Sequence, residues 1–339
     1  MKVAKLSVSV FCVLAMVLCF SVTSSVAQTK TVKITFSHFW PLGHPVTNLL
    51  DAWAKEVEKR TKGTVNVTIF TAGTLTPAPK CYDGVVKGIS GMGSSAMGYT
   101  KGRFPLMEVL ELPWGCETAL VATRMANAFY RKFLPQELSD TKVMFFQAHG
   151  PGIVHTKKPV RKLEDMKGLK IRSTGTSAKI ATALGATPVA MPMGDTYDAI
   201  AKGVVDGSMA PISSLAGFKW GEVAKCTTEN FGAAYTQAFF VVMNKGAWNS
   251  LPADAKAVIE KINEEWIERT GRVWDEYDEM GRDFVKKLGN EIISLSKEEN
   301  KRWSQACEGM MDEYLKYAQE RGLPGNQAVQ FCRDYLKNR

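Results

Sequence analysis

The residue types that most often carry out chemistry do not assemble into an enzyme motif in this chain. The four histidines are His38, His44, His149 and His155. They form neither an HExxH string nor another pair at helical spacing that would bind a catalytic zinc. No GxSxG nucleophile elbow and no P-loop string occurs in the sequence. The sequence therefore predicts that the protein is not an enzyme and uses no metal and no cofactor.

One string has the form of a dinucleotide-binding loop, because residues 91–96 match GxGxxA. A true site needs a strand before the string, a helix after it and an acid about 20 residues further on. Gly88 weakens a preceding strand, Gly98 interrupts a following helix, and Glu108 and Glu111 come too early. We interpret the small residues as ones that let a loop approach a ligand or a neighbouring strand.

The cysteines also lack a metal or redox pattern, because none lies in a CxxC pair. Cys12 and Cys19 belong to the apolar N-terminal run. The other cysteines are Cys81, Cys116, Cys226, Cys307 and Cys332. Cys307 and Cys332 both lie in a helical C-terminal region and are the best candidates for a disulfide in an oxidising compartment.

Strands and helices alternate along most of the chain. Residues 31–36 alternate as a strand, residues 45–61 place apolar side chains at helical spacing, and residues 64–70 form a second strand. This βαβ spacing indicates a sheet covered by helices. Further strands are expected at 142–147, 168–172, 187–191, 204–210 and 239–244, with helices at 177–184 and 194–202.

The C-terminal part is helical. Residues 252–288 lack an internal proline and repeat apolar residues every three or four positions. A helix of about 37 residues would span roughly 55 Å, which exceeds the diameter of one domain, so we expect it to run across two. Residues 296–337 are further helix, broken at 322–325.

The N-terminus has the layout of a secretory signal peptide. Lys2 and Lys5 precede an apolar run at 6–20, and Ser25 and Ala27 place small residues before a cut after Ala27. We therefore expect a periplasmic protein. The net charge is +9, but acidic and basic residues are interleaved, so the sequence predicts no nucleic-acid partner and suits a protein that handles small anions.

A series of short motifs in the middle of the chain resembles the substrate-binding proteins of tripartite ATP-independent periplasmic (TRAP) transporters. The matching residues are Lys158-Pro159-Val160, 168–172, 184–189, Met191-Pro192, Tyr197, 203–207 and Pro211. The resemblance implies an α/β protein of two lobes with mixed sheets flanked by helices, a hinge of crossing strands and one long domain-spanning helix. We expect lobe I at 28–149 plus 238–278, and lobe II at 150–237 plus 279–339.

In that family the arginine that ends the "KIR" strand pairs with the carboxylate of the ligand, and Arg172 holds this position. A planar guanidinium binds a carboxylate through two hydrogen bonds. The chain departs from sialic-acid-type members at two other positions, where Met193 replaces a phenylalanine and Ala210 an asparagine. It also has 150–153 where those members carry a second arginine. We therefore expect one anionic headgroup with a compact or apolar body.

Other residues are candidates for the ligand-binding site by position alone. They follow predicted strands or lie near the crossing strands: His38, Phe39, Trp40, Ser94, Ser95, His149, Tyr235 and Gln237. A packing role is an equally good interpretation for each of them.

The resemblance implies a monomeric protein that captures a small organic anion by cleft closure and delivers it to a TRAP permease. The favoured ligand is a monocarboxylate with an apolar or aromatic body. A small sulfonate or 2-oxo acid is the alternative ligand, because a guanidinium also binds those oxygens. An ABC-type binding protein and an exported enzyme are more distant alternatives.

Overall fold

The structure is a computed structural model that describes residues 31–338. The predicted signal peptide, 1–27, lies outside the described residues. Among the helices of the described part, none combines the length and apolar character needed to cross a bilayer.

The first sheet has the strand order β2-β1-β3-β10-β4. Its strands are β1 (Val32–His38), β2 (Val65–Phe70), β3 (Met92–Ala96), β4 (Thr141–Ala148) and β10 (Ala238–Asn244). Strand β1 runs parallel to both of its neighbours, whereas β10 runs antiparallel to β3 and β4. The sheet is therefore mixed, and β10, which comes late in the sequence, lies between the earlier strands β3 and β4.

The second sheet has the order β11-β9-β5-β8-β6-β7. Its strands are β5 (Gly152–Thr156), β6 (Lys170–Arg172), β7 (Thr187–Val189), β8 (Gly207–Pro211), β9 (Cys226–Glu229) and β11 (Glu291–Ser294). Strands β6, β7 and β8 pair in parallel, whereas β5 is antiparallel to β8 and β9. Two mixed sheets with flanking helices confirm the predicted fold class.

Two segments carry the chain between the sheets and run side by side. One joins β4 to β5 through His149, and the other joins β9 to β10 through Tyr235 and Gln237. The backbone N–H of Gly152 donates to the carbonyl of Tyr235 at 2.6 Å, and that of His149 donates to the carbonyl of Gln237 at 3.4 Å. These paired crossings place side chains from both segments at the junction of the sheets.

The helices pack on the faces and ends of the sheets. Those before the long helix are α2 (Pro45–Arg60), α3 (Cys81–Val86), α4 (Ala119–Phe133), α5 (Thr176–Ala183), α6 (Met193–Ala201), α7 (Ser214–Gly217) and α8 (Lys245–Asn249). Helix α2 begins with Pro45, and the Nδ1 atom of His44 accepts the N–H of Val46 at 3.2 Å as its cap. This cap fixes the ring of His44 at the end of the loop that follows β1.

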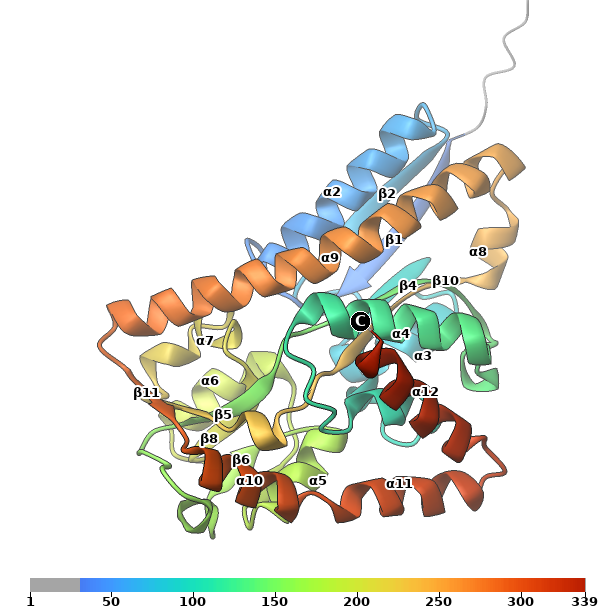
Figure 1. Cartoon of the computed structure of the whole chain (residues 1–339). Coiled ribbons are helices and arrows are strands. Elements are labelled where there is room, and N and C mark those ends of the chain that lie inside the picture. The colour runs from blue at the N-terminus through green and yellow to red at the C-terminus, as the bar shows by residue number, and fades with distance from the viewer. Residues whose placement is uncertain (1–30, 339) are drawn as a thin grey trace, which may run out of the picture. The chain divides into compact units, whose positions relative to one another are not determined.

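The predicted long helix is α9 (Ala253–Lys287), with 35 residues and a length of about 52 Å. It packs on α2, α4 and β4 toward one end and on α7 toward the other (Figure 1). Two glycines allow this close packing, because a Cβ on Gly271 would collide with Leu120 of α4 and one on Gly281 with the carbonyl of Ile212. One helix thus contacts elements that belong to both sheets.

The C-terminal segment forms α10 (Lys297–Ala306), α11 (Gly309–Gln319) and α12 (Gly325–Lys337). Helix α12 packs against α4, which follows the first sheet's early strands, although residues 279–339 were assigned to lobe II. All strands of the first sheet fall in predicted lobe I and all strands of the second in predicted lobe II. The lobe boundaries themselves stay a prediction.

The cysteines are packing residues in the described part of the chain. Cys81, Cys226, Cys307 and Cys332 are free buried thiols, so the disulfide suggested between Cys307 and Cys332 does not form. Both side chains belong to the hydrophobic core beneath the C-terminal helices. Burial raises the pKa of the Cys307 thiol to about 11, which disfavours its reactive thiolate form.

The GxGxxA string forms strand β3 rather than a phosphate-binding loop. This strand lies between β1 and β10 in the first sheet. A Cβ on Gly93 would lie 2.6 Å from Val85 and 2.8 Å from the Sγ atom of Cys81. The glycine therefore lets helix α3 pack directly on the sheet.

Candidate functional site

A small cavity of about 20 Å³, here called the aromatic cavity, lies at the junction of the two sheets. Its lining residues come from the loops after β1 and β3, from the ends of β6 and β8, from the first residues of α6 and β10, from α7 and α9, and from the crossing segments. They are Phe39, Trp40, His44, Tyr99, His149, Arg172, Met193, Ala210, Pro211, Ser214, Phe218, Tyr235, Gln237, Phe239, Trp274 and Tyr277.

Arg172 ends strand β6, and its guanidinium is held inside this cavity by polar and aromatic contacts. Its Nε donates to the carbonyl oxygen of Met191 at 3.0 Å, and its Nη2 donates to the hydroxyl of Tyr99 at 3.4 Å. The guanidinium carbon lies 5.9 Å from the ring centre of Trp220, a cation–π distance. The residue is only 3% exposed, yet no carboxylate among residues 31–338 lies within ion-pair distance of it.

Aromatic rings form the walls around this charge. Phe239 of β10 and Trp274 of α9 stack with ring centres 5.4 Å apart and planes 5° from parallel. Phe39 and Trp40 stack at 4.3 Å in the loop after β1. The indole N–H of Trp274 donates to Oε1 of Gln147 at 3.0 Å, so its polar atom is satisfied and its ring faces are available for packing.

The two histidines of the cavity are neutral. Burial, with a smaller contribution from the charge of Arg172, lowers the pKa of His149 to about 4, although its hydrogen bond to the carbonyl of Gly150 acts in the opposite direction. Burial also lowers the pKa of His44 to about 3, with a smaller contribution from His38. Nδ1 of His149 donates to the carbonyl of Gly150 at 2.5 Å. Among the described lining residues, Arg172 is therefore the one group that carries charge at neutral pH.

The structure brings most of the predicted site residues together. Eight of the eleven line the aromatic cavity: Arg172, Met193, Ala210, Phe39, Trp40, His149, Tyr235 and Gln237. Their positions are shared between the two sheets and the crossing segments. This placement is what a ligand-binding role requires, and the role itself stays a prediction.

The other three predicted residues, His38, Ser94 and Ser95, do not line this cavity. They lie within β1 and β3, where side chains alternate between the two faces of a covered sheet. Ser95 donates from Oγ to the carbonyl of Ala78 at 2.9 Å, and Ser94 accepts from Nε2 of Gln147 at 3.5 Å. His38 is 1% exposed, and burial lowers its pKa to about 4. The sequence predicts the ends of strands only to within a few residues. It therefore could not distinguish residues inside a strand, such as His38, from residues of the following loop, such as Phe39 and Trp40.

Several lining residues were not predicted from the sequence. They are His44, Tyr99, Pro211, Ser214, Phe218, Phe239, Trp274 and Tyr277. Trp274 and Tyr277 lie three residues apart on α9, and their helical spacing is the same for core packing as for lining a cavity. Tyr99 follows strand β3, and the sequence did not predict this strand because Gly93 within it and Gly98 just after it add nothing to a hydrophobic pattern.

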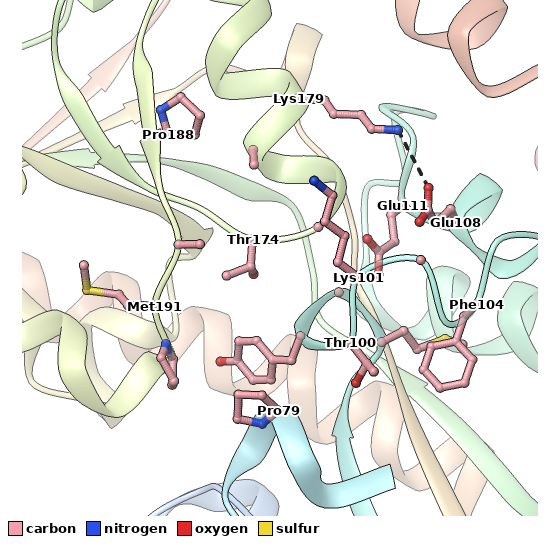
Figure 2. A pocket seen from close by; sticks show the side chains of 18 of the residues that line it. Pro79, Thr100, Lys101, Phe104, Glu108, Glu111, Thr174, Lys179, Pro188 and Met191 are labelled. Carbon is pink, nitrogen blue, oxygen red and sulfur yellow. Dashed lines mark ion pairs between the residues drawn. The ribbon is translucent and has the colours of Figure 1, made fainter. Parts of the chain in front are cut away.

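A second and larger cavity, of about 910 Å³, is here called the outer cavity (Figure 2). Thr100, Lys101, Phe104, Glu108 and Glu111 contribute side chains from the segment after β3. Thr174, Lys179, Pro188 and Met191 contribute from the second-sheet side, Tyr317 comes from α11 and Arg321 from the turn after it. Nζ of Lys179 lies 3.7 Å from a carboxylate oxygen of Glu108, an ion pair between two residues that line this cavity (Figure 2).

The donor set of these cavities does not favour a metal. Within the described range, no group of three or more His, Cys, Asp or Glu side chains is arranged to hold an ion. What the arrangement can do is bind an anion, because one fixed guanidinium and several aromatic rings surround a small, mostly buried site.

Comparison with known proteins agrees with this geometry. Residues 36–317 match the family model described as bacterial extracellular solute-binding protein, family 7. A TRAP solute-binding protein from Rhodoferax ferrireducens, solved with benzoate, is 29% identical and superposes with a TM-score of 0.86, covering 91% of this chain and 98% of that one. A marine metagenome TRAP protein specific for aromatic acid ligands, solved with 3-hydroxybenzoate, is 30% identical with a TM-score of 0.86 and the same coverages.

A relative with a different ligand is similar over the same span. The C4-dicarboxylate-binding periplasmic protein DctP of Rhodobacter capsulatus is 26% identical, with 85% of this chain and 87% of the relative covered. The family and the similar solved structures are binding proteins. The family model covers most of the chain, and the fold, the cavity and the similar structures all agree with it. This chain therefore belongs to the bacterial extracellular solute-binding proteins of family 7, the substrate-binding proteins of TRAP transporters.

Proposed function

We propose that this chain captures a small aromatic or apolar monocarboxylate in the periplasm, as a monomer, and delivers it to the membrane permease of a TRAP transporter. The observation that carries the proposal is Arg172, a buried guanidinium without a carboxylate partner in the described part of the chain. A buried charge is unfavourable until a counter-charge reaches it. A ligand carboxylate supplies that counter-charge through charge-assisted hydrogen bonds.

The charges around the cavity favour a single carboxylate on the ligand. A second carboxylate would need a second cation, but His44 and His149 are neutral because burial lowers their pKa values to about 3 and about 4. An unpaired anion in a closed, aromatic site is strongly disfavoured. The C4-dicarboxylate specificity named for the Rhodobacter capsulatus relative is therefore not expected here.

The body of the ligand is inferred from the walls. Phe39, Phe239 and Trp274 offer ring faces, and pairs of aromatic rings contribute about 0.5–1.5 kcal/mol beyond their burial. Met193 and Ala210 add apolar surface. Two TRAP solute-binding proteins that are 29% and 30% identical to this chain were solved with benzoate and with 3-hydroxybenzoate, and these complexes support the same ligand class.

Ligand entry requires the cavity to open. Its volume of about 20 Å³ holds about one water molecule, so an aromatic acid fits only after the lining residues move apart. The lining comes from both sheets, and the chain passes between them through the two crossing segments, α9 and the C-terminal helices α10 to α12. We infer that the sheets separate by bending at these segments. A ligand that contacts both sides then favours closure.

A small sulfonate or a 2-oxo acid is the alternative ligand. Either would also satisfy the guanidinium of Arg172. A relative from Nostoc carries the name monocarboxylate 2-oxoacid-binding periplasmic protein and is 23% identical over 81% of this chain. The aromatic walls disfavour this alternative, because a 2-oxo acid such as pyruvate would leave the ring faces without a partner.

A thermal-shift screen of the purified protein, freed of bound ligand by unfolding and refolding, tests the proposal. The panel contains benzoate, phenylacetate, pyruvate, methanesulfonate, succinate and glucuronate. A ligand present at 100 times its Kd stabilises the folded protein by about 2.7 kcal/mol. We expect benzoate or phenylacetate to raise the melting temperature most. Shifts by pyruvate or methanesulfonate alone would select the alternative ligand, and shifts by succinate or glucuronate alone would contradict the proposed site.

A further inference from the structure

The aromatic cavity and the outer cavity are neighbours that share one lining residue. Tyr99 lines both, and among the described residues no other does so. It ends the short helix η2 (Met97–Tyr99), which directly follows the central strand β3 of the first sheet. Its ring therefore stands between a closed site of about 20 Å³ and a space of about 910 Å³.

The side chain of Tyr99 is held from both sides of the junction. Its hydroxyl accepts hydrogen bonds from Nη2 of Arg172 at 3.4 Å and from the backbone N–H of Met193 at 3.1 Å, both from the second-sheet side. Its ring packs edge-to-face on Phe39 of the first-sheet side, with centres 5.5 Å apart. Burial raises the pKa of the hydroxyl, so it stays protonated at neutral pH.

Two further contacts beside Tyr99 separate the aromatic cavity from the outer cavity. Gln237, which lines the aromatic cavity, donates to Glu111, which lines the outer cavity, at 3.3 Å. Gly98 and Gly175 approach so closely that a Cβ on Gly175 would lie 2.8 Å from the Cα of Gly98. The approach of Gly98 to Gly175 is a backbone contact and that of Gln237 to Glu111 is a single side-chain hydrogen bond, whereas Tyr99 contributes a large aromatic ring that a substitution can remove.

On the basis of the proposed function, we propose that Tyr99 sets the length of the ligand. Its side chain closes the aromatic cavity next to the anchoring guanidinium and confines the site to compact monocarboxylates. With the ring removed, an acid bound through Arg172 extends into the outer cavity. That cavity offers Met97, Phe104 and Met191 as apolar surface, so it suits an elongated aryl monocarboxylate.

The arginine remains positioned without the tyrosine. Nε of Arg172 keeps its hydrogen bond to the carbonyl of Met191 at 3.0 Å, and Trp220 remains beneath the guanidinium. Truncating Tyr99 therefore changes the space available to the ligand more than the anchor. Tyr99→Phe separates the two effects, because it removes the hydroxyl and leaves the ring.

The test compares Kd values for benzoate and biphenyl-4-carboxylate by calorimetry in the wild-type protein and its variants. We expect the wild type to prefer benzoate by about a hundredfold or more, and Tyr99→Ala to reduce this preference by at least about tenfold. Tyr99→Phe should weaken both acids while leaving the preference within about threefold. Tyr99→Leu, which keeps an apolar contact with Phe39, serves the same purpose as Tyr99→Ala should the latter fold poorly.

Tyr317→Ala is the matched control, because Tyr317 lines the outer cavity but not the aromatic cavity. It should leave the preference unchanged. Equal affinity of the wild type for both acids, or an unchanged preference in Tyr99→Ala and Tyr99→Leu, would overturn the role of Tyr99 while leaving the proposed function intact. If the wild type binds neither acid, the proposed ligand class fails and the inference fails with it.

Discussion

The side-chain amide of Gln237 donates a hydrogen bond to Oε1 of Glu111 at 3.3 Å, and this contact joins the aromatic cavity to the outer cavity. Glu111 is 2% exposed, and its Oε2 accepts the backbone N–H of Thr176 at 3.5 Å. Burial outweighs these hydrogen bonds and raises the pKa of Glu111 to about 7, with a smaller effect from Glu108. The carboxyl group therefore keeps its proton in the folded protein at mildly acidic pH.

Glu111→Gln should reduce the dependence of stability on pH. Between pH 4.5 and about 7, the unfolded chain has lost the proton of Glu111 while the folded chain keeps it. The free energy of unfolding therefore falls as the pH rises through this window, by on the order of 3 kcal/mol from this group. Glutamine keeps the shape of the side chain and cannot titrate, so the free energy of unfolding of the variant should fall less over this pH range than that of the wild type.

Denaturant unfolding of wild type and Glu111→Gln at pH 5 and pH 8 measures the difference. Glu137 and Asp278 are also buried carboxyls with pKa values raised to about 7. Because of these two groups, the free energy of unfolding should still fall with rising pH in both proteins. An identical decrease in wild type and variant would show that Glu111 is ionised at low pH in the folded state.

Gly175→Ala should weaken ligand binding because the closed junction has no room for the added methyl group. Gly175 has a φ of +55°, and a Cβ there would lie 2.8 Å from the Cα of Gly98. These glycines follow β6 and β3, which belong to different sheets. We expect benzoate affinity to fall by about tenfold or more, measured by calorimetry.

Gly168→Ala is the control for backbone strain. Gly168 has a φ of +79°, but a Cβ there would meet nothing within 4 Å. Both variants should lose about 1–2 kcal/mol of stability from the left-handed backbone, and only Gly175→Ala should lose affinity. Equal affinities in the two variants would contradict a tight approach of the two glycines in the bound form.

Arg172→Ala should abolish measurable binding of the carboxylate ligand while the protein stays folded. Loss of a bidentate, charge-assisted contact in a closed site should weaken benzoate by more than about a hundredfold. Arg161→Ala is the control, because Arg161 is exposed and pairs with Glu291 at 2.8 Å on the surface. Binding by Arg172→Ala within about tenfold of the wild type would disprove the assignment of the anchor.

Tyr277→Phe should stabilise the ligand-free protein. The hydroxyl of Tyr277 is buried and has no hydrogen-bond partner among the described residues. Removing a buried, unsatisfied polar group should raise the free energy of unfolding by about 1 kcal/mol. The measurement is denaturant unfolding without ligand.

Tyr235→Phe is the matched comparison with the opposite expected sign. Its buried hydroxyl donates to the carbonyl of Met209 at 3.2 Å, so its removal should lower the free energy of unfolding by about 1 kcal/mol. A loss of stability of similar size in Tyr277→Phe would mean that its hydroxyl has a partner in solution.

Much of the secondary structure was predictable from local patterns. The long helix expected at 252–288 is Ala253–Lys287, because its apolar spacing continues without a proline. Strand β3 was missed, because glycine has no side chain and adds nothing to a hydrophobic pattern. Gly91, which precedes the strand, and Gly93 within it are explained by close neighbours, Ile34 and Val85, that only the packed structure reveals.

The sequence alone determined the fold class, the long helix and the position of Arg172 at the end of a strand. The long helix follows from apolar periodicity within one segment, whereas the two-lobed fold class and the place of Arg172 follow from the resemblance of short motifs spread along the chain. Only the tertiary structure decided that Tyr99 stands between two cavities, that Trp274 stacks on Phe239, and that the histidines are buried and neutral. These properties depend on which distant segments pack together, because burial and contact are set by the folded chain and not by residue type.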